Sequence, residues 1–294
     1  MGDGGQGIPF PPDAIVRLSL PIFAALLGAA LLHAVWNALV RRDPDRTAAA
    51  TAIAAGGAVV GVVLLPFLPS MNLAAAPFAL CTSFIHVAYF ALIGRTYRHG
   101  ELSVSYPIMR GLAPLLVTAV AAIFIETPAL IVVVGIVIVT TGIVSQSVDG
   151  LKRGSRGVGA AVANAGVIAS YTLVDGLGAR ASGAPATYVA WILVGAAITT
   201  ISWRAFLTWR AALDALFPRA LMGVAGGAMS YAAYGIALWA MTFTPIGAVA
   251  AVRESSVLFA TAIGSLALGE RFGATRWLAA VLVVAGLALV EFGG

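Results

Sequence analysis

Two charged residues, Arg253 and Glu254, stand side by side in the apolar run AVAAVRESSVLFATAIG at 248–264. A third, Arg110, lies inside the apolar stretch SYPIMRGLAPLL. A charged side chain surrounded by apolar groups needs an opposite charge or a set of hydrogen bonds, because burial removes its hydration. Guanidinium and carboxylate groups can pair with one another or bind a small charged solute. These three residues are therefore the first candidates for a binding site.

The composition of the chain indicates where these charges lie. The 294 residues are 61% hydrophobic and only 10% charged, with a mean hydropathy of +0.99. Soluble domains carry about 25% charged residues, so this chain could hardly cover a water-facing surface. Apolar stretches near the ~20 residues that span a bilayer recur along most of its length. We therefore predict an all-α polytopic membrane protein in contact with the lipid bilayer.

Other classes of function find little support in the sequence. The net charge of +5 resides in short loops and does not point to nucleic acid. The lone Cys81 excludes an internal disulfide and a thiolate metal cluster, and we expect no cofactor and no metal site. The first 17 residues lack a basic region and a small-residue cleavage site, so the first apolar segment is expected to be retained.

Ten transmembrane helices with short connections are predicted. A tail at 1–17 is expected to precede two five-helix units, at 18–148 and 157–292. The predicted spans are 18–40, 47–69, 73–94, 102–125, 128–148, 157–178, 186–203, 220–243, 245–268 and 274–292.

The basic residues predict the orientation of these spans. Thirteen of the 17 Lys and Arg residues fall in loops after the odd-numbered spans, and only Arg17 and Arg180 fall on the opposite side. Basic loops stay in the cytoplasm. We therefore expect both termini outside a cell (inner) membrane.

The two halves show a weak internal repeat. An offset of 144 aligns Glu126 with Glu270 and places Arg110 opposite Glu254. Because each unit has an odd number of helices, the two units would run in opposite directions, as in the inverted repeats of many secondary transporters. Further pairs at offsets of 138 to 145 are Gly142 with Gly286, His86 with Tyr231, Tyr89 with Tyr234, His33 with Tyr171, and Asn37 with Asp175.

The alignment suggests a partner for one of the buried charges. Neighbours on a helix point about 100° apart, so Arg253 and Glu254 do not face each other. Arg110 is the best candidate to pair with Glu254, which leaves Arg253 as a spare cation. Such a pair could bind substrate or switch during transport, and it could equally be a structural link between the halves. Pro107 and Pro114 predict a kinked or partly unwound fourth helix.

Polar and aromatic residues recur on single faces of four further spans, at spacings of three or four. They could line a central cavity or serve as packing residues. Asn37 and Asp175 are expected near span ends within reach of water, and Tyr188 and Trp191 as interface anchors or cavity walls. The predicted substrate-binding residues are Arg110, Arg253, Glu254, His86, Tyr89, Tyr231, Tyr234, His33, Trp36, Asn37, Tyr171 and Asp175.

The last two spans carry a family resemblance. A small-residue helix ends in Gly269-Glu270, followed by Arg271 and an apolar helix with the late Gly286. This pattern resembles one half of an EamA-like protein of the drug/metabolite transporter superfamily. In the first half Glu126 and Gly142 match it, although the Gly and the basic residue are missing. The resemblance implies a ten-helix, two-repeat exporter with a central cavity. Family members often have cytoplasmic termini, whereas the loop charges predict the reverse.

Three functions follow from these patterns. The favoured one is a secondary transporter of a small polar or zwitterionic metabolite such as an amino acid, because the buried charges have both signs with a positive excess. The alternative is a proton-coupled exporter of organic cations, with Glu254 or Asp175 as the proton carrier. An intramembrane enzyme is a remote alternative: DGLGAR at 175–180 resembles the start of a CDP-alcohol phosphotransferase signature but lacks its other aspartates. A scaffold would gain little from the buried charges. We expect a monomer or homodimer.

Overall fold

The structure is a computed structural model that describes residues 18–99, 102–152, 154, 156–207, 210, 214, 216–268 and 274–292. Within these ranges the chain folds into helices without any strand. The tail predicted at 1–17 lies outside the described residues.

The helices follow the predicted spans closely. The first half contains α1 (Leu20–Arg42), α2 (Arg46–Leu64), α3 (Ala76–His99), α4 (Leu102–Phe124), α5 (Leu130–Ser145) and the short α6 (Val148–Lys152). The second half contains α7 (Val158–Ser182), α8 (Pro185–Leu207), α10 (Ala220–Met241), α11 (Ile246–Arg253), α12 (Ser256–Leu268) and α13 (Ala274–Phe292). Single 3₁₀ turns flank three of them, at η2 (Leu65–Phe67), η3 (Leu73–Ala75) and η4 (Phe217–Arg219).

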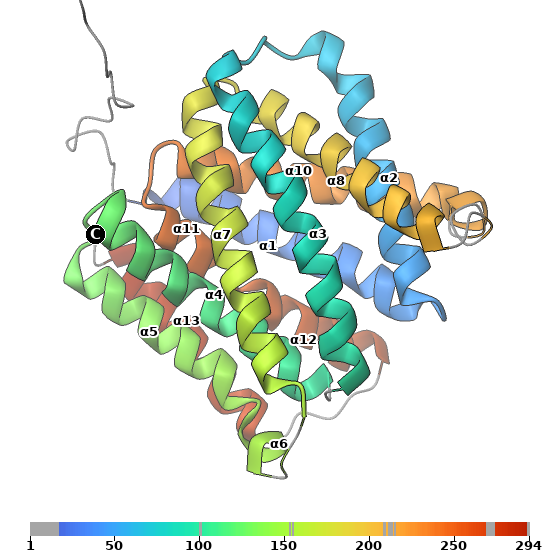
Figure 1. The fold of residues 1–294 in the computed structure, drawn as a ribbon. Helices are drawn as coiled ribbons and strands as arrows, with labels where there is room; N and C mark the ends of the chain where they lie inside the picture. Colours follow the sequence, from blue (N-terminus) through green and yellow to red (C-terminus); the bar gives the residue numbers. More distant parts are fainter. Residues whose placement is uncertain are drawn as a thin grey trace, which may run out of the picture.

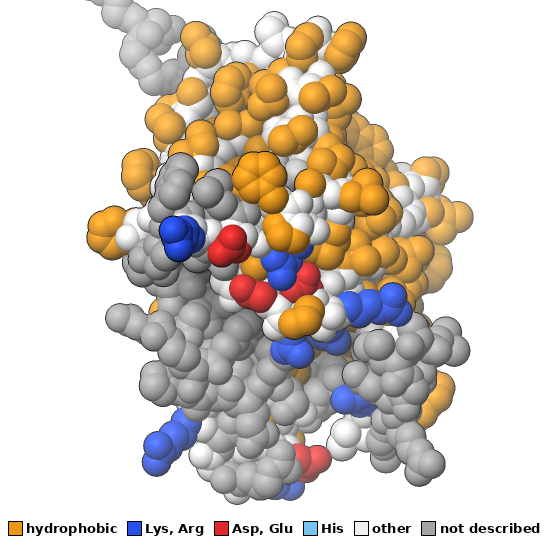
Figure 2. All heavy atoms as spheres, turned by 90° about the vertical axis from the view of Figure 1, so that its right-hand side faces the viewer, with side chains coloured by type: hydrophobic (Ala, Val, Ile, Leu, Met, Phe, Trp, Pro, Cys, Tyr) orange, Lys and Arg blue, Asp and Glu red, His pale blue; other side chains and the backbone are white. Residues whose placement is uncertain are grey.

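The surface of the molecule suits a lipid environment. Eight helical segments of the described chain are long and apolar enough to cross a membrane, and two more apolar stretches, Leu73–Tyr89 and Leu130–Ser145, are shorter. Large apolar side chains such as Phe84, Phe124 and Leu221 are more than two-thirds exposed. Figure 2 shows hydrophobic side chains over the upper part of one face, with the charged ones gathered in its lower half. A soluble protein rarely exposes so large an apolar surface.

Helices from the two halves pack against each other throughout the bundle (Figure 1). α5 lies along α13, α2 lies between α10 and α8, and α7 contacts both α3 and α4. Glycines allow two of these contacts. A Cβ at Gly56 would lie 2.0 Å from the carbonyl oxygen of Gly223, and one at Gly135 would lie 2.7 Å from that of Gly286. Small residues at these positions therefore bring the helix backbones into direct contact.

The break in regular helix occurs in a different place from the one expected. α4 runs through Pro107 and Pro114 as one helix, so the predicted unwinding there is wrong. Instead, the ninth span is divided at Glu254 and Ser255, whose amides donate to carbonyls three residues earlier. Proline removes one backbone bond that neighbouring packing can tolerate. The polar residues 253–256 lie inside a long apolar run, and four residues were too few to predict a break in the span from the sequence.

Candidate functional site

The centre of the candidate site is an ion pair between the two halves. Arg110 Nη2 lies 3.0 Å from Glu254 Oε1, and the two side chains are only 11% and 5% exposed. α4 supplies the arginine, and the turn after α11 supplies the carboxylate. The two helices approach closely because Gly247 lies against Thr118, where a Cβ would come within 2.3 Å of Oγ1. The pairing expected from the repeat alignment is therefore present.

Arg253 remains the unpaired cation of the site. Within the described part of the chain, its guanidinium has no carboxylate or carbonyl oxygen at hydrogen-bonding distance. Its Cζ atom lies 5.1 Å from the centre of the Tyr234 ring, a cation–π distance. A cation held by an aromatic face alone remains available to an incoming anionic group.

Asp175 accepts hydrogen bonds from three neighbouring helices. Thr82 of α3 donates at 3.2 Å, Tyr188 of α8 donates at 3.3 Å, and Tyr234 of α10 donates to Oδ2. Gly178 makes room for this arrangement, because a Cβ there would meet the Tyr188 hydroxyl at 2.1 Å. Asp175 is completely buried, so the expectation that it lies at a span end in reach of water is wrong. The expectation that Tyr188 serves as an interface anchor is also wrong, because Tyr188 is completely buried.

A cluster of aromatic rings connects α3 with α7. The His86 and Tyr171 rings stack with centroids 5.0 Å apart, and Tyr89 packs edge-on to Tyr171 at 6.0 Å. The Nδ1 atom of His86 lies 2.8 Å from the Thr82 carbonyl oxygen. Because a carbonyl only accepts hydrogen bonds, Nδ1 carries the proton. His86, Tyr89 and Tyr171 therefore come together, as the shared faces of their helices indicated.

The predicted residues of α1 contact one another, and His33 lies within range of the charges of Arg110 and Arg253. Tyr231 is held elsewhere. The rings of His33 and Trp36 meet edge-on at 4.9 Å, and Asn37 Nδ2 donates to the His33 carbonyl. The hydroxyl of Tyr231 donates to the Ala186 carbonyl at 3.0 Å. Tyr231 thus satisfies its polar group on the backbone of α8 and, among the described residues, makes no hydrogen bond with the Arg110–Glu254 pair.

Several buried polar atoms around the ion pair lack a partner. Arg110 Nε, Glu254 Oε2, and the hydroxyls of Ser255 and Ser256 make no hydrogen bond, and neither does Trp36 Nε1 on α1. Buried polar atoms normally have partners, so such a group of orphans indicates a missing ligand or water. A cavity beside the pair has a volume of only about 10 Å³, which is enough for about one water molecule. The site is closed in this conformation.

The structure also contains a second buried ion pair that the sequence reasoning did not assign to any site. Arg180 Nη2 donates to Glu126 Oε2 at 2.9 Å, and both side chains are less than 5% exposed. Arg180 also donates to the carbonyls of Met241 and Thr244, while Glu126 Oε1 accepts from the Ile246 amide at 2.6 Å. This pair therefore joins the end of α4, the end of α7 and the start of α11. The signals were present, because Glu126 belongs to the repeat and Arg180 is one of only two basic residues predicted on its side of the membrane.

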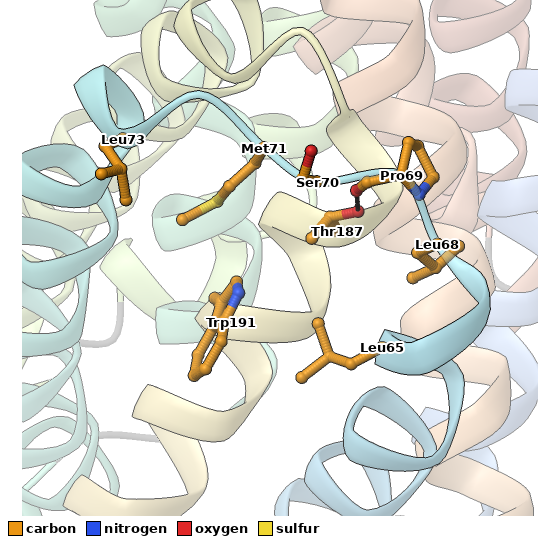
Figure 3. Close-up of a pocket in the computed structure, with 8 residues that line it drawn as sticks. All are labelled: Leu65, Leu68, Pro69, Ser70, Met71, Leu73, Thr187 and Trp191. Atoms are coloured by element: carbon orange, nitrogen blue, oxygen red, sulfur yellow. Dashed lines mark hydrogen bonds between the residues drawn. The ribbon is translucent and has the colours of Figure 1, made fainter.

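A larger hollow in the described surface lies away from these charges. It has a volume of about 440 Å³ and opens at the ends of α2 and α8, where Thr187 donates to the Pro69 carbonyl at 2.6 Å. Its lining residues are mostly apolar and carry no charge: Leu65, Leu68, Pro69, Ser70, Met71, Leu73, Thr187 and Trp191 (Figure 3). Trp191 thus lines an open hollow. The chemistry favours the small buried site over this larger one.

Fold and site together define an all-helical protein with apolar helices of membrane-spanning length and with charged groups buried between its two halves. Residues 155–292 match the family model of the EamA-like transporter family. The resemblance inferred from the sequence is thereby confirmed for the second half, which matches a family of transporters.

Two further comparisons concern the whole chain. Among solved structures, one described as the crystal structure of a protein is similar over 95% of this chain and 97% of its own, with a TM-score of 0.67 and 16% identity. This similarity extends the likeness of fold to both halves. No curated protein matches the sequence.

Proposed function

We propose that this protein is a secondary transporter that exports a small polar or zwitterionic metabolite, such as an amino acid, by alternating access. The observation that carries the proposal is the closed site at Glu254. It combines a buried carboxylate with a free oxygen, a guanidinium with a free Nε, and the unpaired cation Arg253. The ammonium group of a zwitterion could bind Glu254, and its carboxylate could bind the guanidinium groups of Arg110 and Arg253.

The packing of the helices supports an arrangement of ten spans in two inverted repeats. In such a repeat each span corresponds to the span at the same place in the other half, so α1 corresponds to α7 and α3 to α10. The contact of α3 with α7 then has its equivalent in the contact of α10 with α1. Both contacts are present, as are the equivalent contacts of α3 with α8 and of α10 with α2. The pairs α5 with α13 and α2 with α8 map onto themselves. Such an exchange gives a carrier two related conformations open to opposite sides.

The closed site supports alternating access. A space that holds about one water cannot hold a metabolite, so α4 and α11 must separate for binding. Export as the direction, a cell (inner) membrane as the location and outward-facing termini belong to the same proposal. They rest on the family and on the basic loops.

The first experiment is a thermal-stability screen of the purified protein with amino acids, organic anions, amines and lipophilic cations. A ligand that binds the folded state raises its melting temperature by mass action. We expect amino acids or organic anions to stabilise the wild type, and Arg253→Ala or Glu254→Gln to abolish the effect. Stabilisation by cations alone would replace the zwitterion with the organic-cation alternative.

A transport assay then tests the role of the site. Proteoliposomes loaded with the stabilising compound should release it with the wild type and not with Glu254→Gln, which keeps the shape of the side chain without its charge. Asp149→Asn serves as the control, because Asp149 is exposed on α6. Normal transport by Glu254→Gln would remove this residue from the mechanism.

A further inference from the structure

We propose that Asp175 is a proton-binding site, separate from the Arg110–Glu254 pair, and that its protonation favours binding of the substrate's anionic group at Arg253. This inference rests on the proposed function and adds the coupling ion to it. It starts from the contrast between the two buried carboxylates. Glu254 faces a guanidinium at 3.0 Å, whereas the three hydrogen-bond donors of Asp175 are all neutral hydroxyls.

The surroundings of Asp175 can accept either form of the carboxyl group. When it is ionised, it accepts the three hydroxyl bonds. When one proton is added to Oδ2, that oxygen can donate to the Tyr234 oxygen, provided that the tyrosine hydrogen turns away, because a hydroxyl both donates and accepts. No covalent bond other than the O–H bond is made or broken. A guanidinium, which only donates, would hold the carboxyl group in its ionised form, and none contacts Asp175 within the described residues.

The groups facing Asp175 from the packed helices are few. α3 contributes Thr82, with His86 and Cys81 nearby, and α8 contributes Tyr188. α10 contributes Tyr234, and α11 contributes the charge of Arg253 behind the Tyr234 ring. The helix of Asp175 itself carries Tyr171. α4 carries Arg110, whose charge is met by Glu254, and η3 has no titratable residue.

Tyr234 connects the proton site to the substrate site. Its hydroxyl donates to Asp175, and its ring lies against the Arg253 guanidinium. While Asp175 is ionised, its negative charge repels an anionic group that approaches Arg253, since both lie in a medium of low dielectric constant. Protonation removes this repulsion. By reciprocity, binding of the anionic group must favour uptake of a proton at Asp175.

The proton itself is the first probe, so the test does not depend on knowing a substrate. Infrared difference spectra of the purified protein are recorded while the pH is lowered, and the carbonyl stretch of protonated carboxyl groups is followed. We expect a band that is absent from Asp175→Asn, retained in Glu254→Gln, and shifted in Tyr234→Phe, which loses one hydroxyl and keeps the ring. A wild type without such a band, or a band that persists in Asp175→Asn, would overturn the proposal.

The second measurement tests the coupling with the amino acid or organic anion found in the thermal screen. Its affinity for the wild type should increase as the pH falls, by up to about tenfold per pH unit for one proton. Asp175→Asn should bind at all pH values as tightly as the wild type at low pH. A pH-independent wild-type affinity would refute coupling and leave the transporter proposal standing. If no compound binds, the transporter proposal fails, and the infrared titration still decides whether Asp175 takes up a proton.

Discussion

At the scale of single residues, four charged side chains of the candidate site are held in three different ways. Arg110 and Glu254 neutralise each other, Arg253 lies against an aromatic ring, and Asp175 is held by hydroxyls. A buried ion pair adds little to stability by itself, because desolvation offsets the attraction. The retention of several such groups in one region of the membrane interior is therefore better explained by binding than by folding.

A double-mutant cycle measures the coupling of Arg110 with Glu254. Arg110→Ala should lower the thermal stability strongly, because removing one partner of a buried pair costs about 3–5 kcal/mol. The double variant Arg110→Ala/Glu254→Ala should recover part of the loss, since no uncompensated charge remains. Thermal unfolding in detergent gives the four stabilities. Strictly additive losses would show that the two side chains act independently.

At the scale of helices and loops, the site depends on contacts at helix ends. Glu126 follows α4 and accepts a hydrogen bond from the first amide of α11, which satisfies a donor that the helix leaves free. Arg180 binds the carbonyls at the end of α10 and between α10 and α11. This second pair closes the end of the bundle that lies opposite the basic loops. In a carrier that opens at each end in turn, the pair has to separate.

Weakening this pair should expose that end of the bundle. Glu126→Gln keeps an acceptor for the Ile246 amide but loses the charge that holds Arg180. In a Cys81→Ser background, a cysteine at the buried Met241 position should react faster with a membrane-impermeant maleimide when Glu126→Gln is added. A cysteine at Ile143 serves as the control, because Ile143 is buried near the end of α5, and Glu126 lies before the start of that helix. An unchanged rate at position 241 would mean that the pair does not hold this end closed.

A third ion pair, in the loops at the basic end, should make the stability pH-dependent. Arg219 Nε donates to Asp43 Oδ2 at 2.8 Å, and this hydrogen bond holds the pKa of Asp43 below its usual value. A lowered carboxyl pKa stabilises the fold above the unfolded value of about 3.9, and the contribution disappears as the pH falls through the folded value. Asp43→Asn should therefore melt earlier than the wild type at neutral pH, and the difference should vanish in acid.

The comparison needs a variant with the same change of charge and no ion partner. Asp149→Asn at the same end of the bundle meets this need and should melt like the wild type throughout. Screening by salt weakens an exposed pair, so the Asp43→Asn difference should also shrink in concentrated salt. A difference that persists in acid would assign the effect to the shape of the loop.

At the scale of the whole molecule, interleaved halves explain why the charged residues meet. α4 of the first half packs on α7 and α11 of the second, and α1 packs on α10 and α12. Each half therefore contributes to a site that neither could form alone. Figure 1 shows this mixing, with the green α5 of the first half beside the red α13 of the second.

The orientation of the molecule can be tested with a reporter at the C-terminus. A reporter that is active only outside the cytoplasm should be active when it is fused after residue 294, because the loops after the odd-numbered spans carry most of the positive charge. A reporter that is active only in the cytoplasm should be inactive when fused after residue 294 and active when fused after Lys152. The reverse pattern would show that the usual family orientation outweighs the loop charges.

The sequence by itself determined the helices, because long apolar segments in lipid must satisfy their own backbone hydrogen bonds. It also predicted the Arg110–Glu254 pair, because the weak internal repeat aligns the two positions. These features depend on local composition and on a repeat, and both can be read along a single chain.

The tertiary structure alone decided the rest of the site. Thr82, Tyr188 and Tyr234 lie 93, 13 and 59 residues from Asp175, and Glu126 lies 54 residues from Arg180. Which hydroxyl reaches which carboxylate depends on how closely the helices approach, and that distance is set by small residues such as Gly178 and Gly247 at the contacts. A sequence read one segment at a time contains no measure of these distances.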